Sequence, residues 1–306
     1  MLTCGCPAKR ATTSAPAAFG HVDFTGCAAI VAGPTCEVSR DRALVIAPPS
    51  DATDVAIAFA VGASDLVPAT SDGSRARRVT IPMGAREIVV RGKEAGRVVE
   101  WRLALREATP EPAVVTEARE LRAKGALDDA ARTLTEQIAV LEGASRALAL
   151  SALARVEIAR GASDAAREHL GAAMDAHAAV GRFSTAADDA TVLVFLLLEQ
   201  RRFADARKTL ARASEWSKDY YDGRVQVRFY EGYLARDTGD VRTALAKLDG
   251  AIADADAMSL ARISGIMRME RALTHAEIGR VDEALGALRD LESIEGRPRA
   301  IAGSRR

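Results

Sequence analysis

The sequence has few aromatic residues, no net charge and no long apolar run. Aromatic side chains make up 4% of the 306 residues, which disfavours a pocket built on large rings. The 42 Lys and Arg residues balance the 42 Asp and Glu residues, so no overall field attracts nucleic acid or an anionic membrane. The longest apolar run, from Thr191 to Leu198, is far shorter than the roughly 20 residues that cross a bilayer. We therefore expect a protein or peptide partner, no nucleic acid and no membrane span.

Cysteine is also scarce, and all four cysteines lie near the start of the chain, at Cys4, Cys6, Cys27 and Cys36. Their spacing lacks the paired Cys-x2-4-Cys knuckles of a zinc site. We expect reduced, partly buried cysteines, with a disulfide or a metal site as the alternative. A nucleophile pair of Cys27 and His21 would lack an orienting acid at a recognisable spacing. The sequence thus predicts no catalytic residue, no metal, no cofactor and no enzymatic activity.

The first third of the chain alternates between turns and short β-branched segments. Residues 1–20 are rich in Ala, Thr, Ser, Pro and Gly and predict a disordered leader. Residues 21–108 predict a small antiparallel β domain, with strands at 43–47, 54–61, 78–82, 87–91 and 97–105. In the last of these, Val99, Trp101, Leu103 and Leu105 alternate with mostly polar residues, as in a strand with one solvent-exposed face.

From residue 112 to residue 296 the apolar period is helical and a phrase repeats. The phrase is Gly-x4-Ala-x3-Leu, and it begins at Gly125, Gly161, Gly239 and Gly279, with Arg201 in place of glycine in a fifth copy. The intervals are 161−125 = 36, 201−161 = 40, 239−201 = 38 and 279−239 = 40 residues. Glycine ends one helix, alanine lets two helices approach, and leucine fills the hairpin between them. We therefore predict about five stacked helical hairpins.

The segment from Gly232 to Ala244, GYLARDTGDVRTA, resembles a tetratricopeptide repeat in the small residue of its first helix and in its turn. The resemblance implies a right-handed solenoid whose concave groove binds a protein or peptide. The intervals exceed the usual repeat of about 34 residues, and no copy has the Trp-led start or the terminal proline. Longer hairpins, as in kinesin-light-chain-like arrays, would have this pattern. The predicted fold is mainly α: a tetratricopeptide-like solenoid after a small β domain.

Nearly the whole chain resembles the front half of bacterial proteins that join tetratricopeptide repeats to a caspase-like CHAT protease domain. The resemblance is carried by the Trp101-Arg102-Leu103 strand, the segment from Glu117 to Leu121, and the segment from Gly125 to Ala130. It implies, as an alternative function, the sensor half of such a protease, with its catalytic domain missing or encoded separately. The family's catalytic His and Cys have no match here, because every cysteine lies at or before Cys36. A signalling or transcription regulator is a second alternative.

A tetratricopeptide register assigns one set of residues to the concave groove. The predicted partner-binding residues are Arg119, Arg122, Arg155, Phe195, Phe229, Tyr233, Arg236, Met269 and Leu273. Arginines and aromatic rings together suit an extended peptide with acidic and apolar side chains. The alternative is that these residues only pack between neighbouring helices. Asp188 and Asp189 are interpreted as a carboxylate pair at a helix start, where the helix dipole favours negative charge.

The last predicted helix leaves an apolar face without an evident cover. Leu285 and Leu288 lie on this face, and we expect it to be covered by another subunit or by a C-terminal partner domain. Residues 297–306 form a basic tail. We predict a cytoplasmic location, with a lipoprotein as the alternative if the start codon is misassigned. The sequence does not name the partner, the process or the oligomeric state.

Overall fold

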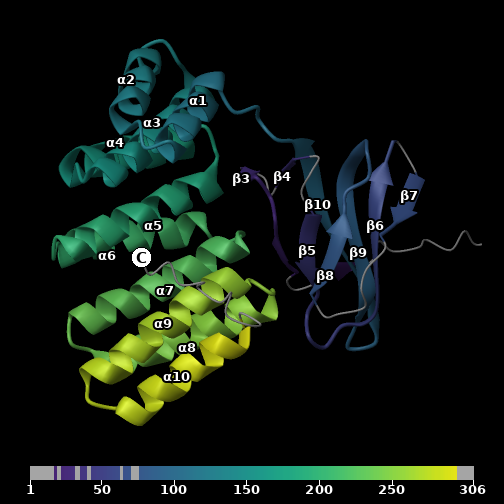
Figure 1. The fold of residues 1–306 in the computed structure, drawn as a ribbon. Coiled ribbons are helices and arrows are strands. Elements are labelled where there is room, and N and C mark those ends of the chain that lie inside the picture. Colours follow the sequence, from purple (N-terminus) through teal and green to yellow (C-terminus); the bar gives the residue numbers. More distant parts are fainter. Residues whose placement is uncertain are drawn as a thin grey trace, which may run out of the picture.

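The computed structural model describes residues 17–18, 22–31, 35–39, 43–62, 65–69 and 76–294, with backbone alone at 17–18 and 290–294. Figure 1 shows a β domain beside a curved array of helical hairpins. Except for Ala17 and Ala18, the predicted leader lies outside the described residues, as do Cys4, Cys6, His21 and the basic tail.

The β domain contains two sheets that enclose one apolar core. The larger sheet has the order β3-β4-β10-β9-β6-β7, with β1 also paired to β10, and the smaller has the order β2-β5-β8. The strands are β1 (Ala17–Ala18), β2 (Asp23–Thr25), β3 (Ala29–Val31), β4 (Thr35–Val38), β5 (Ala43–Ala47), β6 (Thr53–Val61), β7 (Asp65–Pro68), β8 (Arg77–Thr80), β9 (Ala85–Glu94) and β10 (Arg97–Glu107). Val99 and Leu103 of β10 alternate inward as predicted and are buried in this core.

The predicted antiparallel domain is confirmed, with two parallel pairings that the sequence did not indicate. β10 runs parallel to β4 on one side, and its first half also runs parallel to β1. β1 lies inside the segment that the composition assigned to a disordered leader, so the prediction fails for Ala17 and Ala18, which pair with Val99 and Glu100. Backbone pairing can order a segment that has no apolar period of its own.

Ten helices form five consecutive hairpins in the described part of the chain, which confirms the solenoid. The helices are α1 (Ala113–Ala123), α2 (Leu127–Ile138), α3 (Gly143–Arg160), α4 (Ser163–Ala179), α5 (Phe183–Glu199), α6 (Phe203–Trp216), α7 (Tyr221–Asp237), α8 (Val241–Ala257), α9 (Ala261–Glu277) and α10 (Val281–Ile294). Within each hairpin the odd-numbered helix comes first. Figure 1 shows the hairpins stacked in sequence order, from α1 and α2 at one end to α9 and α10 at the other.

Each hairpin turns at the residue that opens the repeated phrase. Gly125, Gly161, Gly239 and Gly279 have φ between 75° and 84°, and Arg201 has φ 55°. The residue after each of them donates its backbone N–H to a carbonyl five residues back, for example Ala162 to Glu157 at 2.9 Å. This is the helix-ending bond pattern that a left-handed residue permits. The phrase alanines, Ala130, Ala166, Ala206, Ala244 and Ala284, are all buried.

The β domain docks on the array through a buried ion pair and a backbone hydrogen bond. Glu37 of β4 is fully buried and accepts from Arg182 at 2.7 Å, just before α5. Arg106 and Thr109 donate to the other carboxylate oxygen, at 2.5 and 3.0 Å. The Ile30 N–H of β3 donates to Ser184 Oγ at 2.7 Å. Polar groups that are paired in this way fix the position of β3 and β4 against α5.

The prediction of reduced cysteines is wrong for two of the four, because Cys27 and Cys36 form a disulfide. The bond joins Cys27, two residues before β3, to Cys36 in β4. The antiparallel pairing of these strands brings the two thiols together although they are nine positions apart in the sequence. The spacing concealed the pair because it matches no metal or disulfide signature. Disulfides persist mainly in oxidising compartments, so this bond speaks against the predicted cytoplasm, and the location stays a prediction. Among the described residues, none of the helices has the length and apolarity needed to cross a membrane.

Candidate functional site

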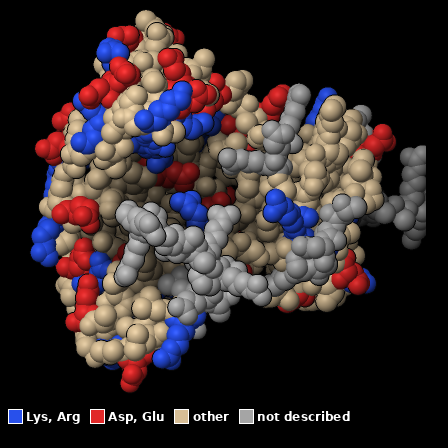
Figure 2. Space-filling view, viewed as in Figure 1, with Lys and Arg blue, Asp and Glu red and all other residues tan. Residues whose placement is uncertain are grey.

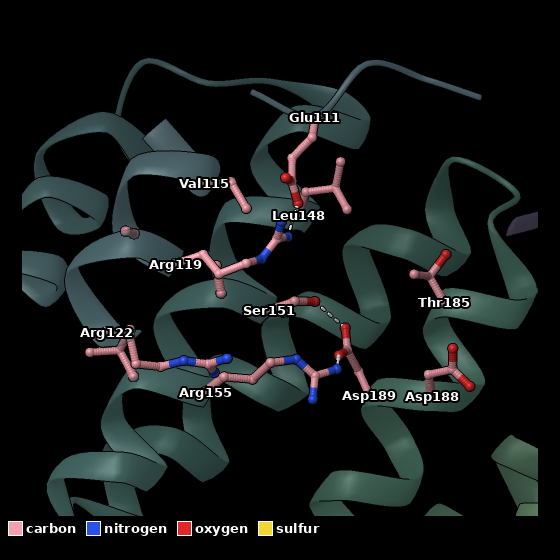
Figure 3. Close-up of a pocket in the computed structure, with 13 residues that line it drawn as sticks. Glu111, Val115, Arg119, Arg122, Leu148, Ser151, Arg155, Thr185, Asp188 and Asp189 are labelled. Carbon is pink, nitrogen blue, oxygen red and sulfur yellow. Dashed lines mark hydrogen bonds and ion pairs between the residues drawn. The ribbon is translucent and has the colours of Figure 1, made fainter. Parts of the chain in front are cut away.

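The first helices of hairpins one to three border a pocket on the inner face of the array. We call it the inner-face pocket. Its volume is about 170 Å³, and its lining comes from α1, α3, α5 and the segment before α1. Figure 3 shows arginines from α1 and α3 on one side and the carboxylates of α5 on the other. In Figure 2 charges of both signs gather at the end of the array formed by the first hairpins.

Three predicted binding residues, Arg119, Arg122 and Arg155, line this pocket together. The Arg119 guanidinium donates to Glu111, and the Arg155 guanidinium donates to Asp189 at 3.2 Å. Arg122 forms no ion pair with the residues that the structure describes, and its side chain is exposed. In Figure 3 the Arg122 guanidinium ends near the start of the Arg155 side chain, which continues toward Asp189. The pocket therefore offers guanidinium N–H donors that internal carboxylates do not saturate.

Behind the arginines lies a buried polar network centred on Asp189. Ser151 donates its hydroxyl to Asp189, and His177 Nε2 lies 3.4 Å from Ser151 Oγ and 3.7 Å from Asp189. Burial raises the pKa of Asp189 to about 6 although Arg155 and Ser151 oppose the rise. Burial lowers the pKa of His177 to about 4, and the charges of Arg182 and Arg155 act in the same direction. His177 is fully buried and its Nδ1 has no partner in the described structure, so this Ser-His-Asp group lacks the oriented base of a catalytic triad.

The interpretation of Asp188 and Asp189 as a carboxylate pair at a helix start is wrong. Helix α5 begins at Phe183, so the two carboxylates lie in its second turn, where the dipole effect is weak. Burial raises the pKa of Asp188 to about 8, with a further rise from the charges of Asp189 and Asp222. Burial also raises the pKa of Asp222 on α7 to about 6. Asp188 is therefore mostly protonated at neutral pH, whereas Asp222 is mostly ionised there, and the two carboxyl groups form a polar centre between α5 and α7.

The predicted groove residues of α5 and α7 differ in their exposure. The Phe195 ring is exposed, whereas Phe229 is 9% exposed and packs against Tyr230 and Tyr233. Arg236 stacks on the Tyr233 ring at 4.1 Å and donates to Glu270 on α9 at 2.7 Å. Phe229 and Arg236 therefore serve mainly to pack α7 against its neighbours, and Tyr233 is half-buried.

The last two predicted residues, Met269 and Leu273 of α9, are exposed. The structure thus brings together the three arginines in one pocket and places the apolar residues farther along the inner face. Sequence reasoning missed Asp189, His177 and the pair of Glu37 with Arg182. Only Asp189 had a signal, because a carboxylate within an otherwise apolar helix such as α5 is expected to be paired or functional. The residues that the structure describes contain no His, Cys, Asp and Glu cluster suited to a metal ion.

Comparison with known proteins places the helical array in the tetratricopeptide-like fold. A variant of the putative kinesin light chain repeats of Podosopora anserina matches with a TM-score of 0.50 and 18% identity, over 60% of this chain and 93% of that one. BtubC (BKLC) from P. vanneervenii matches with 0.50 and 19%, over 62% and 84%. The apo form of RapI matches with 0.52 and 12%, over 60% and 69%. No family model and no curated protein matches the sequence.

Proposed function

We propose that the protein is a non-enzymatic interaction scaffold whose inner face binds an acidic peptide segment of a partner protein. The observation that supports the proposal most directly is the convergence of Arg119, Arg122 and Arg155 at the inner-face pocket. Arg122 has no described ion-pair partner, and Arg155 shares only one nitrogen with Asp189. A carboxylate from outside would be recognised by two parallel N–H donors, the geometry that favours arginine over lysine.

The neighbouring residues suit an extended peptide rather than a small anion alone. From the arginines the inner face continues through Phe195 and Tyr233 to Met269 and Leu273. An acidic residue at the arginines and apolar residues along the later helices would use both parts of this surface. A Rap protein with the same fold, at a TM-score of 0.51 and 13% identity, was solved in complex with the competence and sporulation factor, so the fold itself accommodates a bound factor.

The test uses fluorescent hexapeptides with two adjacent Asp or Glu residues and a matched set in which these are Asn or Gln. Acidic peptides should bind more tightly, and Arg122→Ala with Arg155→Met should weaken their binding by about 1 to 3 kcal/mol. The matched control is Arg132→Ala on α2, an exposed arginine outside the pocket. Equal binding of acidic and amide peptides, or equal binding by the control and the double variant, would refute the proposal.

A second candidate is the regulatory half of a CHAT-type protease, favoured by the order of a β domain before hairpins. In the described part of the chain Cys27 and Cys36 are bonded to each other, so neither is a free nucleophile in this state. The candidate predicts that the chain lacks peptidase activity but changes the activity of a CHAT peptidase added in trans. No change in that activity at saturating concentrations would exclude it. A signalling or transcription regulator would act through the same peptide-binding face.

A further inference from the structure

The leucine of the repeated phrase is buried in four hairpins and exposed in the fifth. Leu134, Leu170, Leu210 and Leu248 are 0, 0, 4 and 1% exposed, whereas Leu288 is 44% exposed. All five occupy the same place, nine residues after the turn residue of the hairpin. The difference must therefore come from what lies against the second helix, and not from the hairpin itself.

In the first four hairpins the following first helix covers this leucine. Leu134 of α2 shares an apolar cluster with Ala149 and Leu153 of α3. In the same way Leu170 and Leu210 share a cluster with residues of α5 and α7, and Leu248 of α8 shares one with Met267 of α9. Helix α10 has no following helix among the described residues, so Leu288 and its neighbour Leu285 face outward.

Helix α9 supplies the other side of the same uncovered surface. Its residues Ile266, Met269 and Leu273 are exposed. Forty residues earlier, at the interval from Gly239 to Gly279, the equivalent positions on α7 carry Gln226, Phe229 and Tyr233, and Phe229 is buried. A first helix packs on both helices of the preceding hairpin. The exposed residues of α9 and α10 therefore border one surface, on which the first helix of a further hairpin would pack. We call Ile266, Met269, Leu273, Leu285 and Leu288 the terminal seat. Leu273 and Leu285 lie at its rim, because Phe195 and Arg207 at their register positions are exposed although α7 follows.

The opposite end of the array has no comparable surface. Helices α1 and α2 contribute no exposed large apolar side chain among the described residues, and α1 exposes Glu117 and Glu120, with Lys124 exposed directly after it. A second copy stacked head to tail would press these charges against the terminal seat at a desolvation cost. The open end in Figure 1, formed by α9 and α10, therefore fits a different occupant.

We propose that the terminal seat binds an amphipathic helix of a partner protein, in the position that the first helix of a sixth hairpin would take. The partner helix presents small residues for close approach and aliphatic residues at spacings of three, four and seven, as α3, α5, α7 and α9 do toward the hairpins before them. This surface is separate from the inner-face pocket. A helix in the seat would cover Met269 and Leu273, so an extended segment bound at the inner-face pocket would then follow the inner face only as far as Tyr233.

The probe is a synthetic peptide with the sequence of α9, residues 261–277, held helical by a side-chain lactam because free helices of this length are marginal in water. Its binding to the full chain is measured by fluorescence anisotropy, with a scrambled peptide in parallel. We expect saturable binding, weakened at least tenfold by Leu285→Ser with Leu288→Ser. The control Met83→Ser removes an exposed apolar side chain of the β domain, far from the seat, and should leave binding unchanged.

Two results would overturn the proposal. The first is absence of saturable binding, or binding that the Leu285→Ser and Leu288→Ser pair leaves unchanged. The second comes from sedimentation of the wild-type chain without peptide. A dimer that the same pair dissociates, together with no binding of the α9 peptide, would assign the seat to a second copy. Because both leucines are exposed, the pair should keep the wild-type circular dichroism and melting temperature, so a loss of binding reports on the seat.

Discussion

The inner face changes in side-chain type along the array, from a first half at α1, α3 and the start of α5 to a second half at the end of α5, α7 and α9. Ten residues before each turn the array carries Val115, Ser151, Thr191, Phe229 and Met269, and six residues before each turn it carries Arg119, Arg155, Phe195, Tyr233 and Leu273. The hairpin backbone repeats, but apart from Val115 the side chains change along the array from charged and hydroxylated to aromatic and aliphatic. A solenoid fixes where a side chain projects and leaves its chemistry free to vary.

The two halves also differ in how they are held. In the first half Asp189, Ser151 and Arg155 bind one another, and Arg182 at the start of α5 pairs with Glu37 of the β domain. In the second half the exposed apolar residues of α9 have no such partners among the residues that the structure describes. Polar pairs around Asp189 and Glu37 thus distinguish the first half, whereas the inner surface of the second half is mainly apolar and has the Arg236–Glu270 pair between α7 and α9. Four measurements test this difference.

The largest effect should follow the removal of Glu37. Glu37→Ala leaves Arg182 buried without its carboxylate, and removing one partner of a buried pair costs about 3 to 5 kcal/mol of unfolding free energy. Urea denaturation measures it. The replacement Glu94→Ala, at a more accessible carboxylate of the same sheet, is the control and should cost under about 1 kcal/mol. A loss for Glu37→Ala as small as that of the control would show that the β domain is not anchored by this pair.

The second test compares one register position in two hairpins. Leu248→Ala should cost about 2 to 5 kcal/mol because α9 covers Leu248, whereas Leu288→Ala should cost less than about 1 kcal/mol. Both variants remove the same atoms from the same place in a hairpin. Equal losses of unfolding free energy would mean that Leu288 is covered in solution, for instance by self-association. The fifth hairpin would then not differ from the four before it.

The third test concerns the carboxyl groups between α5 and α7. Burial raises the pKa of Asp188 from 3.8 to about 8, so the folded chain binds more protons than the unfolded chain between pH 4 and 8. The free energy of unfolding should therefore fall as the pH rises through this window. Asp188→Asn should remove most of the slope between pH 6 and 8 and stabilise the chain at pH 8 by roughly 1 to 3 kcal/mol. Melting temperatures at four pH values measure it, with the exposed Asp164→Asn as control, and an unchanged slope in Asp188→Asn would contradict the raised pKa.

The smallest effect is expected for Tyr233. Because Tyr233 lies in the apolar half, Tyr233→Ala should weaken the binding of an acidic peptide by less than about 1 kcal/mol. The same variant should weaken the binding of a peptide with added Leu or Phe residues by about 1 to 2 kcal/mol. The same anisotropy assay measures both. Equal losses of binding free energy for the two peptides would contradict the proposed chemical difference between the two halves of the inner face. Arg236→Ala is a poorer probe, since it also breaks the pair with Glu270.

Several elements could be predicted from the sequence because their signals are local. The turns at Gly125, Gly161, Arg201, Gly239 and Gly279 follow from a phrase of ten residues, and the strand from Arg97 follows from a period of two. The strands β2, β3 and β4 were missed because they are three or four residues long, too short for a period to appear. The register also assigned Arg119, Arg122 and Arg155 to one face, where the inner-face pocket contains them.

The sequence by itself determined the repeat, the positions of its turns and the residues that each hairpin buries within itself, since these depend on neighbours fewer than twenty residues apart. Only the tertiary structure decided which thiols pair, which carboxylates lose water and which leucine stays uncovered. Cys27 meets Cys36 because β3 and β4 are adjacent, and Glu37 meets Arg182, 145 residues away, because the β domain docks on α5. Burial and pairing of this kind depend on what lies against a residue in space, and that information is not carried by any local pattern.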